Sequence, residues 1–313
     1  MRSDPVYPLD SEWIVSNRPK RNKIDSLMPY GWSVEKELSF DGRVKDTGII
    51  FLSNQECSFK CLMCDLWKNT TTSPTPLGAI SKQIKLTLPH MKGVKQIKLY
   101  NSGSFFDEKS VPFEEYDKIA SLVSGIETVI VEGHPLLINE KSLYFNDQLY
   151  GELEVAIGLE TVHPEILRKL NKKMNVEDFS NAVHFLNDHQ IRSRAFILLR
   201  PPFMSEKEGV YWAKKSIEFA FENGVECCTV IPVRPGNGAM DLLMENGDFN
   251  KPSLDSLEEV LDFGISLKAG RVFADTWDLH LFSTCNACFE KRKHRLEKIN
   301  LSQETVQKIS CGC

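Results

Sequence analysis

The sequence predicts an α/β protein, a partial (β/α)6 TIM-like barrel with a C-terminal cysteine-rich metal-binding extension. Three observations support this. Short β-branched runs alternate with longer amphipathic stretches between residues 47 and 235, as expected when helices join parallel strands. A loop, a helix and a strand are expected to follow in residues 236–283. Most of the nine cysteines form two groups, one near residue 60 and one at the end of the chain. A flat doubly wound sheet would show the same periodicity, so both architectures stay open.

Four segments follow from this pattern. Residues 1–46 are polar and weakly periodic, and we interpret them as a lead-in segment packed across the larger domain. The barrel covers 47–235, the barrel-completing elements 236–283, and a four-cysteine tail 284–313. The expected strands are 48–53, 96–101, 127–133, 153–160, 193–199 and 226–233, with a final one within 271–282. The expected helices are 78–91, 112–124, 140–149, 163–189, 205–223 and 253–270.

Composition excludes several classes of protein. The chain is 42% hydrophobic and 26% charged, which is typical of globular proteins and excludes a disordered or fibrous one. Its 38 basic and 43 acidic residues give a net charge of −5, so no overall positive field attracts nucleic acid or membranes. The start of the chain lacks an apolar export signal, and no apolar run is long enough for a membrane span. We therefore expect a cytoplasmic protein whose cysteines bind metal rather than form disulfides.

The first cysteine group is Cys57, Cys61 and Cys64, directly after the first strand of the predicted barrel. Loops at this end of parallel strands are where α/β barrels bind their ligands. Three thiolates on a [4Fe–4S] cluster leave one iron without a protein ligand, and that iron can bind a small molecule through an amine and a carboxylate. Structural zinc requires four ligands, and no further His or Cys lies close by in the sequence.

The spacing C-x3-C-x2-C after the first strand of a six-unit barrel resembles the radical S-adenosylmethionine (SAM) superfamily over about residues 45–235. The resemblance implies that the three cysteines hold a [4Fe–4S] cluster that binds and reductively cleaves SAM. The products would be methionine and a 5′-deoxyadenosyl radical, which abstracts hydrogen from an unidentified substrate. An external electron donor such as flavodoxin or ferredoxin is then expected. Met63 departs from the pattern, because an aromatic residue usually precedes the third cysteine.

The resemblance also implies a set of SAM contacts. The segment 101–107, NSGSFFD, matches the loop that receives the methionine amino group, and GLET matches the segment whose acid holds the ribose. VRPGNG resembles the segment that touches adenine. The implied cofactor-binding residues are Met63, Ser102, Gly103, Ser104, Asp107, Glu160 and Arg234. For each of them an ordinary structural role in a loop, at a helix start or on the surface stays open.

Two further residues at strand ends are catalytic candidates. Glu132 closes the third expected strand, and Arg200 follows the fifth. An acid at a strand end faces the mouth of a barrel, and an arginine there can bind a carboxylate or a phosphate. Cys227 and Cys228 are adjacent on a strand, so their side chains point to opposite faces, and we interpret them as small buried hydrophobic residues.

The second cysteine group, Cys285, Cys288, Cys311 and Cys313, supplies four thiols. A second iron–sulfur cluster or a zinc ion accepts four thiolates. We favour an auxiliary cluster, because the tail follows the barrel directly and can cover its mouth. A basic run lies between the two cysteine pairs and comprises Lys291, Arg292, Lys293, His294, Arg295 and Lys298. We interpret this run as a solvated helix face, with contact to a phosphate-bearing substrate such as tRNA as the alternative.

The order of NSGSFFD, VEGHP, GLET and the terminal cysteines resembles the branch containing the Elongator catalytic subunit and the archaeosine-forming radical enzyme. Those relatives modify tRNA. The first hypothesis is a radical SAM enzyme with an auxiliary cluster and a small-molecule or RNA substrate. The second is a tRNA-modifying radical SAM enzyme with a structural zinc tail, and the third is a non-catalytic zinc-containing RNA-binding protein. Sulfur insertion, rearrangement, carbon–carbon bond formation and dehydrogenation all stay open as reactions.

Overall fold

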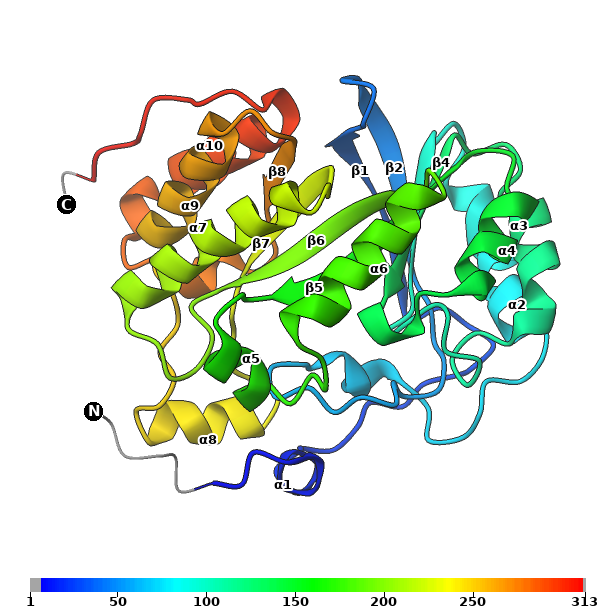
Figure 1. Ribbon diagram of the computed structural model, residues 1–313, viewed down its shortest axis with the longest axis horizontal. Helices are drawn as coiled ribbons and strands as arrows, with labels where there is room; N and C mark the ends of the chain where they lie inside the picture. Colours follow the sequence, from blue (N-terminus) through cyan, green and yellow to red (C-terminus); the bar gives the residue numbers. More distant parts are fainter. Residues whose placement is uncertain (1–6, 312–313) are drawn as a thin grey trace.

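One mixed sheet forms the centre of the molecule (Figure 1), in a computed structural model that describes residues 7–311. The strands lie in the sheet in the same order as in the sequence; the first two form an antiparallel hairpin and the others are parallel. They are β1 (Gly31–Leu38), β2 (Val44–Phe51), β3 (Gln96–Tyr100), β4 (Thr128–Gly133), β5 (Glu152–Glu160), β6 (Arg192–Leu199), β7 (Cys227–Pro232) and β8 (Arg271–Ala274). A doubly wound sheet reverses its strand order at a switch point, so this order excludes the flat alternative and confirms a partial barrel.

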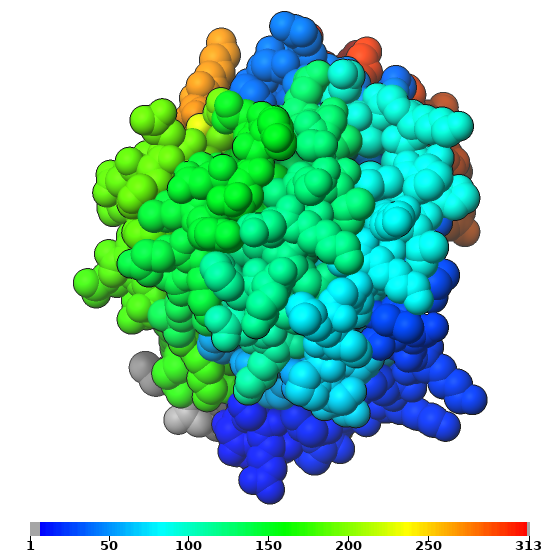
Figure 2. All heavy atoms as spheres, turned by 90° about the vertical axis from the view of Figure 1, so that its right-hand side faces the viewer, coloured from blue at the N-terminus to red at the C-terminus, as the bar shows by residue number. Residues whose placement is uncertain are grey.

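Helices cover the outer face of this sheet (Figure 1). The α-helices are α1 (Ser11–Ser16), α2 (Ala79–Thr87), α3 (Tyr116–Leu122), α4 (Glu140–Gln148), α5 (Pro164–Lys169), α6 (Val176–Asp188), α7 (Glu206–Glu222), α8 (Ala239–Glu245), α9 (Leu254–Ser266) and α10 (Asn286–Ser302). The 3₁₀ helices are η1 (Leu66–Asn69), η2 (Leu88–His90), η3 (Phe113–Glu115), η4 (Pro135–Leu137) and η5 (Leu279–Phe282). Figure 2 shows the side of α2, α3 and α4 as a continuous surface of cyan and green atoms, with the N-terminal segment at its lower edge. None of the described helices is long and apolar enough to cross a membrane.

Each expected strand is present, and its start agrees with the expected start to within a few residues. The differences from the prediction concern the helices and the lead-in segment. The single helix expected over 163–189 is two helices, because Asn171 and Lys173 adopt positive φ and Asn175 begins α6 with a capping box. The loop expected after residue 234 contains α8. The polar lead-in segment contains β1, whose alternating charged residues conceal a strand.

The barrel interior near the start of the parallel strands is filled by charged side chains. The Arg194 guanidinium donates to Glu37 at 2.6 Å and to Glu154 at 2.7 Å, and Arg271 donates to Glu154 at 2.9 Å. Lys98 forms a further ion pair with Glu37. Burial alone would raise the pKa of Glu37, but the charges of Arg194 and Lys98 outweigh it and hold this pKa well below its usual range. We call these five side chains the charged plug, and they close this end of the barrel.

The opposite end of the barrel, where the parallel strands finish, is open to solvent. Here the inward side chains are partly exposed, whereas the outward neighbour on each strand is fully buried beneath a helix. The partly exposed inward residues are Phe51, Tyr100, Glu132, Phe196 and Thr229. Because alternate strand residues face opposite sides of a sheet, this difference marks the mouth of the barrel.

Helix α10 lies against both edge strands of the sheet, β1 and β8. Two side-chain amides at its C-terminal end pair with the free edge of β8. Asn300 of α10 accepts from the Ala274 N–H and donates to its carbonyl, and Gln303, the residue after the helix, does the same with Val272. These contacts satisfy backbone groups that an edge strand otherwise leaves unpaired.

The predicted solvated face of this helix is only partly correct. Lys291, His294 and Lys298 are exposed, but Arg292 and Arg295 are buried. The two arginines face α9, where Arg292 donates to Asp255 and Glu258, and Arg295 donates to Asp262 at 2.7 Å. Both guanidinium groups are therefore engaged in the packing of α10 against α9.

Candidate active site

The loop that carries Cys57, Cys61 and Cys64 leaves β2 at the open end of the barrel and is held from two sides. Asn171, which follows α5, donates to the Lys60 carbonyl at 2.7 Å. Asn237, which follows β7, donates to the carbonyls of Leu62 at 2.7 Å and Cys64 at 3.1 Å. The three cysteines are therefore positioned by the ends of distant strands as well as by their own segment.

The three thiols are surrounded by protein and half-buried. Burial raises the pKa of Cys61 to about 12, and it raises the pKa of Cys57 and Cys64 as well. Three such thiols release their protons only to a strongly bound cation, which an iron–sulfur cluster supplies. Among the described residues, the sulfur atoms of these three cysteines are not all close enough to one another to bind a single metal ion. This donor set and this spacing suit a [4Fe–4S] cluster.

The loop after β3 packs directly against the first cysteine. A Cβ atom added to Gly103 would lie 3.1 Å from the Cβ atom of Cys57 and 3.5 Å from its Sγ atom. The preceding Ser102 has a φ of 54°, and its hydroxyl lies 3.2 Å from the hydroxyl of Tyr30. The backbone of Gly103 thus lies against Cys57, and a side chain at position 103 would crowd this cysteine.

Asp107 and Ser104 also lie in this loop, and both are hydrogen-bonded. The Ser58 hydroxyl donates to Asp107 Oδ2 at 2.9 Å, which joins the cysteine loop to the loop after β3. The Lys109 N–H donates to the other oxygen of Asp107 at 3.1 Å. Ser104 Oγ accepts from the N–H of His134 at 3.2 Å. These two side chains therefore fasten the loops together at the barrel mouth.

Glu160 lies at the end of β5, after an irregularity in the pairing of β5 with β6. Its φ is 64°, and its carboxylate forms a buried ion pair with Lys172. A Cβ atom on Gly158 would lie 2.2 Å from both Glu160 Oε1 and Lys172 Nζ, so only glycine leaves room for the pair. Lys172 was not predicted as a site residue, because nothing in the neighbouring sequence indicates a functional role for it.

A stacked pair of rings connects this ion pair to the cysteine loop. The ring of His134 lies 3.6 Å from the ring of Phe59, at an interplanar angle of 5°. Burial and the charge of Lys172 lower the pKa of His134 to about 3, so the imidazole is neutral and its Nε2 donates to the Lys172 carbonyl at 3.0 Å. Phe59 and His134 were not selected from the sequence, although VEGHP contains the histidine.

Glu132 points into the barrel mouth from β4, beside the inward rings of Phe51 and Tyr100 on the neighbouring strands. Its Oε2 accepts from the Asn101 N–H at 3.2 Å. Burial raises the pKa of Glu132 to about 7, and the hydrogen bond from Asn101 offsets only part of this effect. Glu132 is thus a carboxyl group that can hold or release a proton near neutral pH.

The remaining predicted residues lie around the mouth or outside it. Arg234 pairs with Asp275 and donates to the Trp277 carbonyl at 3.1 Å, and the Trp277 ring meets Phe51 at 5.6 Å. The segment after β8 therefore reaches across the mouth to the end of β2. Arg200 is separate from the cysteine loop: it pairs with Glu206 at the start of α7 and donates to the Lys251 carbonyl at 2.7 Å.

Met63 is half-buried and packs against a second hydrophobic cluster, which lies beneath α1 and α8. Ile14 of α1 and Met240 of α8 belong to this cluster. The side chain therefore contributes to the packing that holds the cysteine loop in place.

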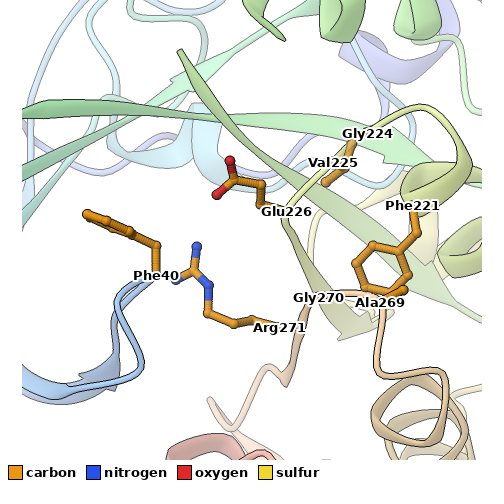
Figure 3. Close-up of a pocket in the computed structure, with 8 residues that line it drawn as sticks. All are labelled: Phe40, Phe221, Gly224, Val225, Glu226, Ala269, Gly270 and Arg271. Atoms are coloured by element: carbon orange, nitrogen blue, oxygen red, sulfur yellow. The ribbon is translucent and has the colours of Figure 1, made fainter. Parts of the chain in front are cut away.

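A surface pocket lies at the other end of the barrel (Figure 3). Phe40, Phe221, Glu226, Gly270 and Arg271 line it, and they precede or connect strands rather than follow them. None of the predicted site residues belongs to its lining. This pocket is therefore separate from the cysteine loop.

Three cysteines of the tail lie together. The sulfur atoms of Cys285, Cys288 and Cys311 are all within 4.8 Å of one another. Interaction with the neighbouring thiols and burial raise the pKa of Cys288 to about 11. The fourth predicted ligand, Cys313, lies outside the described residues. Cys227 and Cys228 are both fully buried, as predicted.

The chain has relatives in archaea, although no protein-family model matches it. An uncharacterized protein of Methanocaldococcus jannaschii is 25% identical, over 94% of this chain and 87% of its own length. The archaeosine synthase subunit beta of Methanosarcina acetivorans is 25% identical, over 64% of this chain and 60% of its own length. That of Thermococcus kodakarensis is 26% identical, over 50% of this chain and 51% of its own length. The chain thus matches about half to three fifths of each synthase subunit.

Three solved structures share the fold. Archaeal Elp3 of Methanocaldococcus infernus, with an N-terminal deletion, has a TM-score of 0.52 at 15% identity, over 71% of this chain and 59% of that one. Methylornithine synthase also has a TM-score of 0.52, at 16% identity, over 70% of this chain and 63% of that one. Coproporphyrinogen III oxidase of Escherichia coli, described as a radical SAM enzyme, has a TM-score of 0.50 at 15% identity, over 70% of this chain and 52% of that one. The fold is that of radical SAM enzymes. The predicted resemblance is confirmed at this level.

Proposed function

We propose that the protein is a radical SAM enzyme whose cluster is held by Cys57, Cys61 and Cys64. The observation that carries the proposal is the placement of three half-buried thiols at the open end of a radical SAM fold, with Cys57 against the backbone of Gly103. When bound, the reduced cluster supplies one electron to SAM, which yields methionine and a 5′-deoxyadenosyl radical.

The chain offers polar groups for both ends of SAM. Ser102, Ser104 and Asp107 lie on the loop beside the first cysteine, where they can accept from the methionine ammonium. Asn101 Oδ1, in the same loop, is buried and has no hydrogen-bond partner among residues 7–311, so it is a further acceptor. Glu160, oriented by Lys172, presents a carboxylate for the ribose hydroxyls. Met63 and Arg234 stay candidates for contact with adenine.

We expect a substrate to bind between the cysteine loop and the inward row of Phe51, Tyr100, Glu132 and Phe196, because these side chains are partly exposed at the mouth. Beneath this row the charged plug closes the barrel, so a substrate enters only through the mouth. Once a substrate covers them, the aromatic rings of this row would limit the access of water to the site of hydrogen abstraction. Glu132 is suited to hold a polar group of the substrate in place, because its carboxyl can donate or accept a hydrogen bond near neutral pH.

A tRNA substrate is the second candidate, supported by two relatives named archaeosine synthase subunit beta. Lys291 and Lys298 are exposed on α10 and can contact phosphates, although the chain as a whole is acidic. Binding to tRNA would weaken steeply as the salt concentration rises, whereas binding of a small uncharged substrate would not. A non-catalytic RNA-binding protein, the third hypothesis, would leave SAM intact.

The decisive experiment measures iron, sulfide and SAM cleavage in the same anaerobically reconstituted samples. We expect about four irons per chain at the first site, and 5′-deoxyadenosine formation that requires a reductant. Cys61→Ser should lose both, whereas Cys228→Ala, a change at a buried cysteine outside both groups, should keep both. A natural chain that binds no iron and leaves SAM intact would contradict the proposal. A cytoplasmic location and flavodoxin or ferredoxin as the electron donor stay predictions.

A further inference from the structure

The tail cysteines are arranged differently from those at the barrel mouth. Their three sulfur atoms lie within 4.8 Å of one another, and among residues 7–311 the mouth cysteines form no such group. In a tetrahedral zinc site with bonds of about 2.3 Å, the sulfur atoms are about 3.8 Å apart. On a [4Fe–4S] cluster each thiolate binds a different iron, so the sulfur atoms are about 6 Å apart. The spacing in the tail is that of ligands to one ion.

The surroundings of these thiols form a rigid site. Cys285 occupies the residue before α10, and Cys288 lies in its first turn, so the two face the same side of the helix. The N–H groups at a helix start favour negative charge, and a centre with several thiolates carries it. Cys288 is buried, whereas Cys285 is half-buried and Cys311 is exposed, so the site lies at the surface of the molecule.

The tail returns to this helix start along a defined path. The Arg295 guanidinium donates to the carbonyl of Val306 at 2.9 Å and to that of Gln307 at 3.2 Å. Lys308 pairs with Asp262 of α9. Residues 303–308 are thus guided back along α9 and α10, and Cys311 arrives beside the cysteines at the start of α10.

We propose that Cys285, Cys288 and Cys311 hold a single zinc ion rather than a second iron–sulfur cluster, and that this ion fastens the tail to α10. Cys313 lies outside the described residues, and the sequence alone makes it the candidate for the fourth coordination position. With Cys313 as the fourth ligand no coordination position would be left open, and the ion would be structural and take no part in SAM cleavage.

The ion would stabilise more than the tail. Helix α10 contacts both edge strands, and the side chains of Asn300 and of Gln303, the residue after the helix, pair with the free edge of β8. By tying the start of α10 to the end of the chain, the ion holds in place the helix that joins the two edges of the open barrel.

Metal analysis of the natural chain, reconstituted with iron and sulfide, tests this proposal. We expect about one zinc beside the irons of the first site. Cys288→Ser and Cys313→Ser should lose the zinc and keep the irons, whereas Cys61→Ser should lose the irons and keep the zinc. Glu304→Ala changes an exposed side chain of the same tail and should keep both metals. Because zinc is read separately from iron and SAM cleavage, failure of the proposed function would leave this result unchanged.

A second measurement uses the natural chain, in case the cysteine variants fail to fold. Removal of zinc by a chelator should speed hydrogen exchange in residues 303–311 and in the first turns of α10, while β4–β6 stay protected. Replacement of zinc by Co²⁺ should give the visible absorption of tetrahedral cobalt bound to thiolates. About eight irons without zinc, a single iron at this site, or a tail without metal would each overturn the assignment. Unchanged exchange after zinc removal would overturn the fastening role.

Discussion

The two cysteine groups offer similar ligands but differ in how their surroundings hold them. At the barrel mouth, three thiols on a loop are spread out, and the ends of several strands present polar groups beside them. In the tail, three thiols converge within 4.8 Å at the start of a helix, and the neighbouring side chains are engaged in packing. The comparison teaches that ligand type alone does not define a metal site. The spacing, and whether a coordination position is left open, separate a site for chemistry from a site for stability.

The largest effect is expected from removal of one ligand at the mouth. Cys61→Ser should lower SAM cleavage by at least about 100-fold, because even outer contacts of metal ligands are worth 10- to 100-fold. The melting temperature should change much less than in Cys288→Ser, since the mouth loop is also held by Asn171 and Asn237. Calorimetry and a SAM cleavage assay on both variants check this. If Cys61→Ser unfolds more readily than Cys288→Ser, the division between chemistry and stability is wrong.

The second-largest effect, on stability and on SAM binding, is expected from the buried ion pair of Glu160 and Lys172 at the mouth. Lys172→Met removes the partner of the buried Glu160 and should reduce the free energy of unfolding by about 3 to 5 kcal/mol. The double variant Glu160→Gln with Lys172→Met leaves no unpaired charge and should regain part of this stability. Its SAM affinity should stay low, because the carboxylate is gone. Denaturant unfolding and SAM binding measure the two effects, and full recovery of SAM affinity in the double variant would exclude Glu160 as a ligand.

Glu132 should give the mouth a dependence on pH. Burial raises the pKa of this carboxyl from 4.5 to about 7 in the folded chain. Between these values the native state keeps a proton that the unfolded state has released, so stability should fall as the pH rises through this window. Glu132→Gln should remove this part of the pH dependence. Unfolding of both proteins at pH 5 and pH 8 provides the measurement, and parallel curves would show that Glu132 is not buried enough to hold its proton.

A smaller effect is expected where the two mouth loops touch. Gly103→Ala places a methyl group 3.1 Å from the Cβ atom of Cys57 and should cost about 1 to 3 kcal/mol, together with some cluster occupancy. Gly125→Ala is a matched control, because a methyl group there meets nothing within 4 Å. Iron content and thermal unfolding of both variants test the contact. Equal iron content and equal thermal stability of the two variants would show that the close contact between the loops is not needed for cluster binding or for stability.

The smallest effect concerns the helix that joins the barrel edges. Gln303→Ala leaves the N–H and carbonyl of Val272 without their side-chain partner and should cost about 1 kcal/mol. Glu304→Ala, which changes the exposed side chain of the next residue, serves as the control. Hydrogen exchange of β8 should rise in the first variant only. Protection of β8 that persists in Gln303→Ala would show that packing alone protects this edge.

Sequence reasoning found the features that recur at short range and missed those that depend on tertiary structure. The strands were predicted because β-branched runs have a local pattern, and the first cysteines because they are close in the sequence. Lys172, His134, Phe59 and Asn237 carry no local signal: each acquires its role from a partner far away in the chain. Strand β1 was missed because its inward side chains are charged, and their burial makes sense only once Arg194 and Lys98 lie opposite.

The first hairpin and the last strand form the two edges of the sheet. The charged plug nevertheless links them, since Arg194 of β6 pairs with Glu37 of β1, while Arg271 of β8 shares Glu154 with it. Each cation is neutralised only when segments that are far apart in the sequence have assembled. Partly assembled chains therefore bury charges without partners and are penalised, which favours a single cooperative folding transition. High contact order also makes that transition slow. A circular permutant or a truncated chain that separates β1 from β6 should lose cooperativity before it loses helix content.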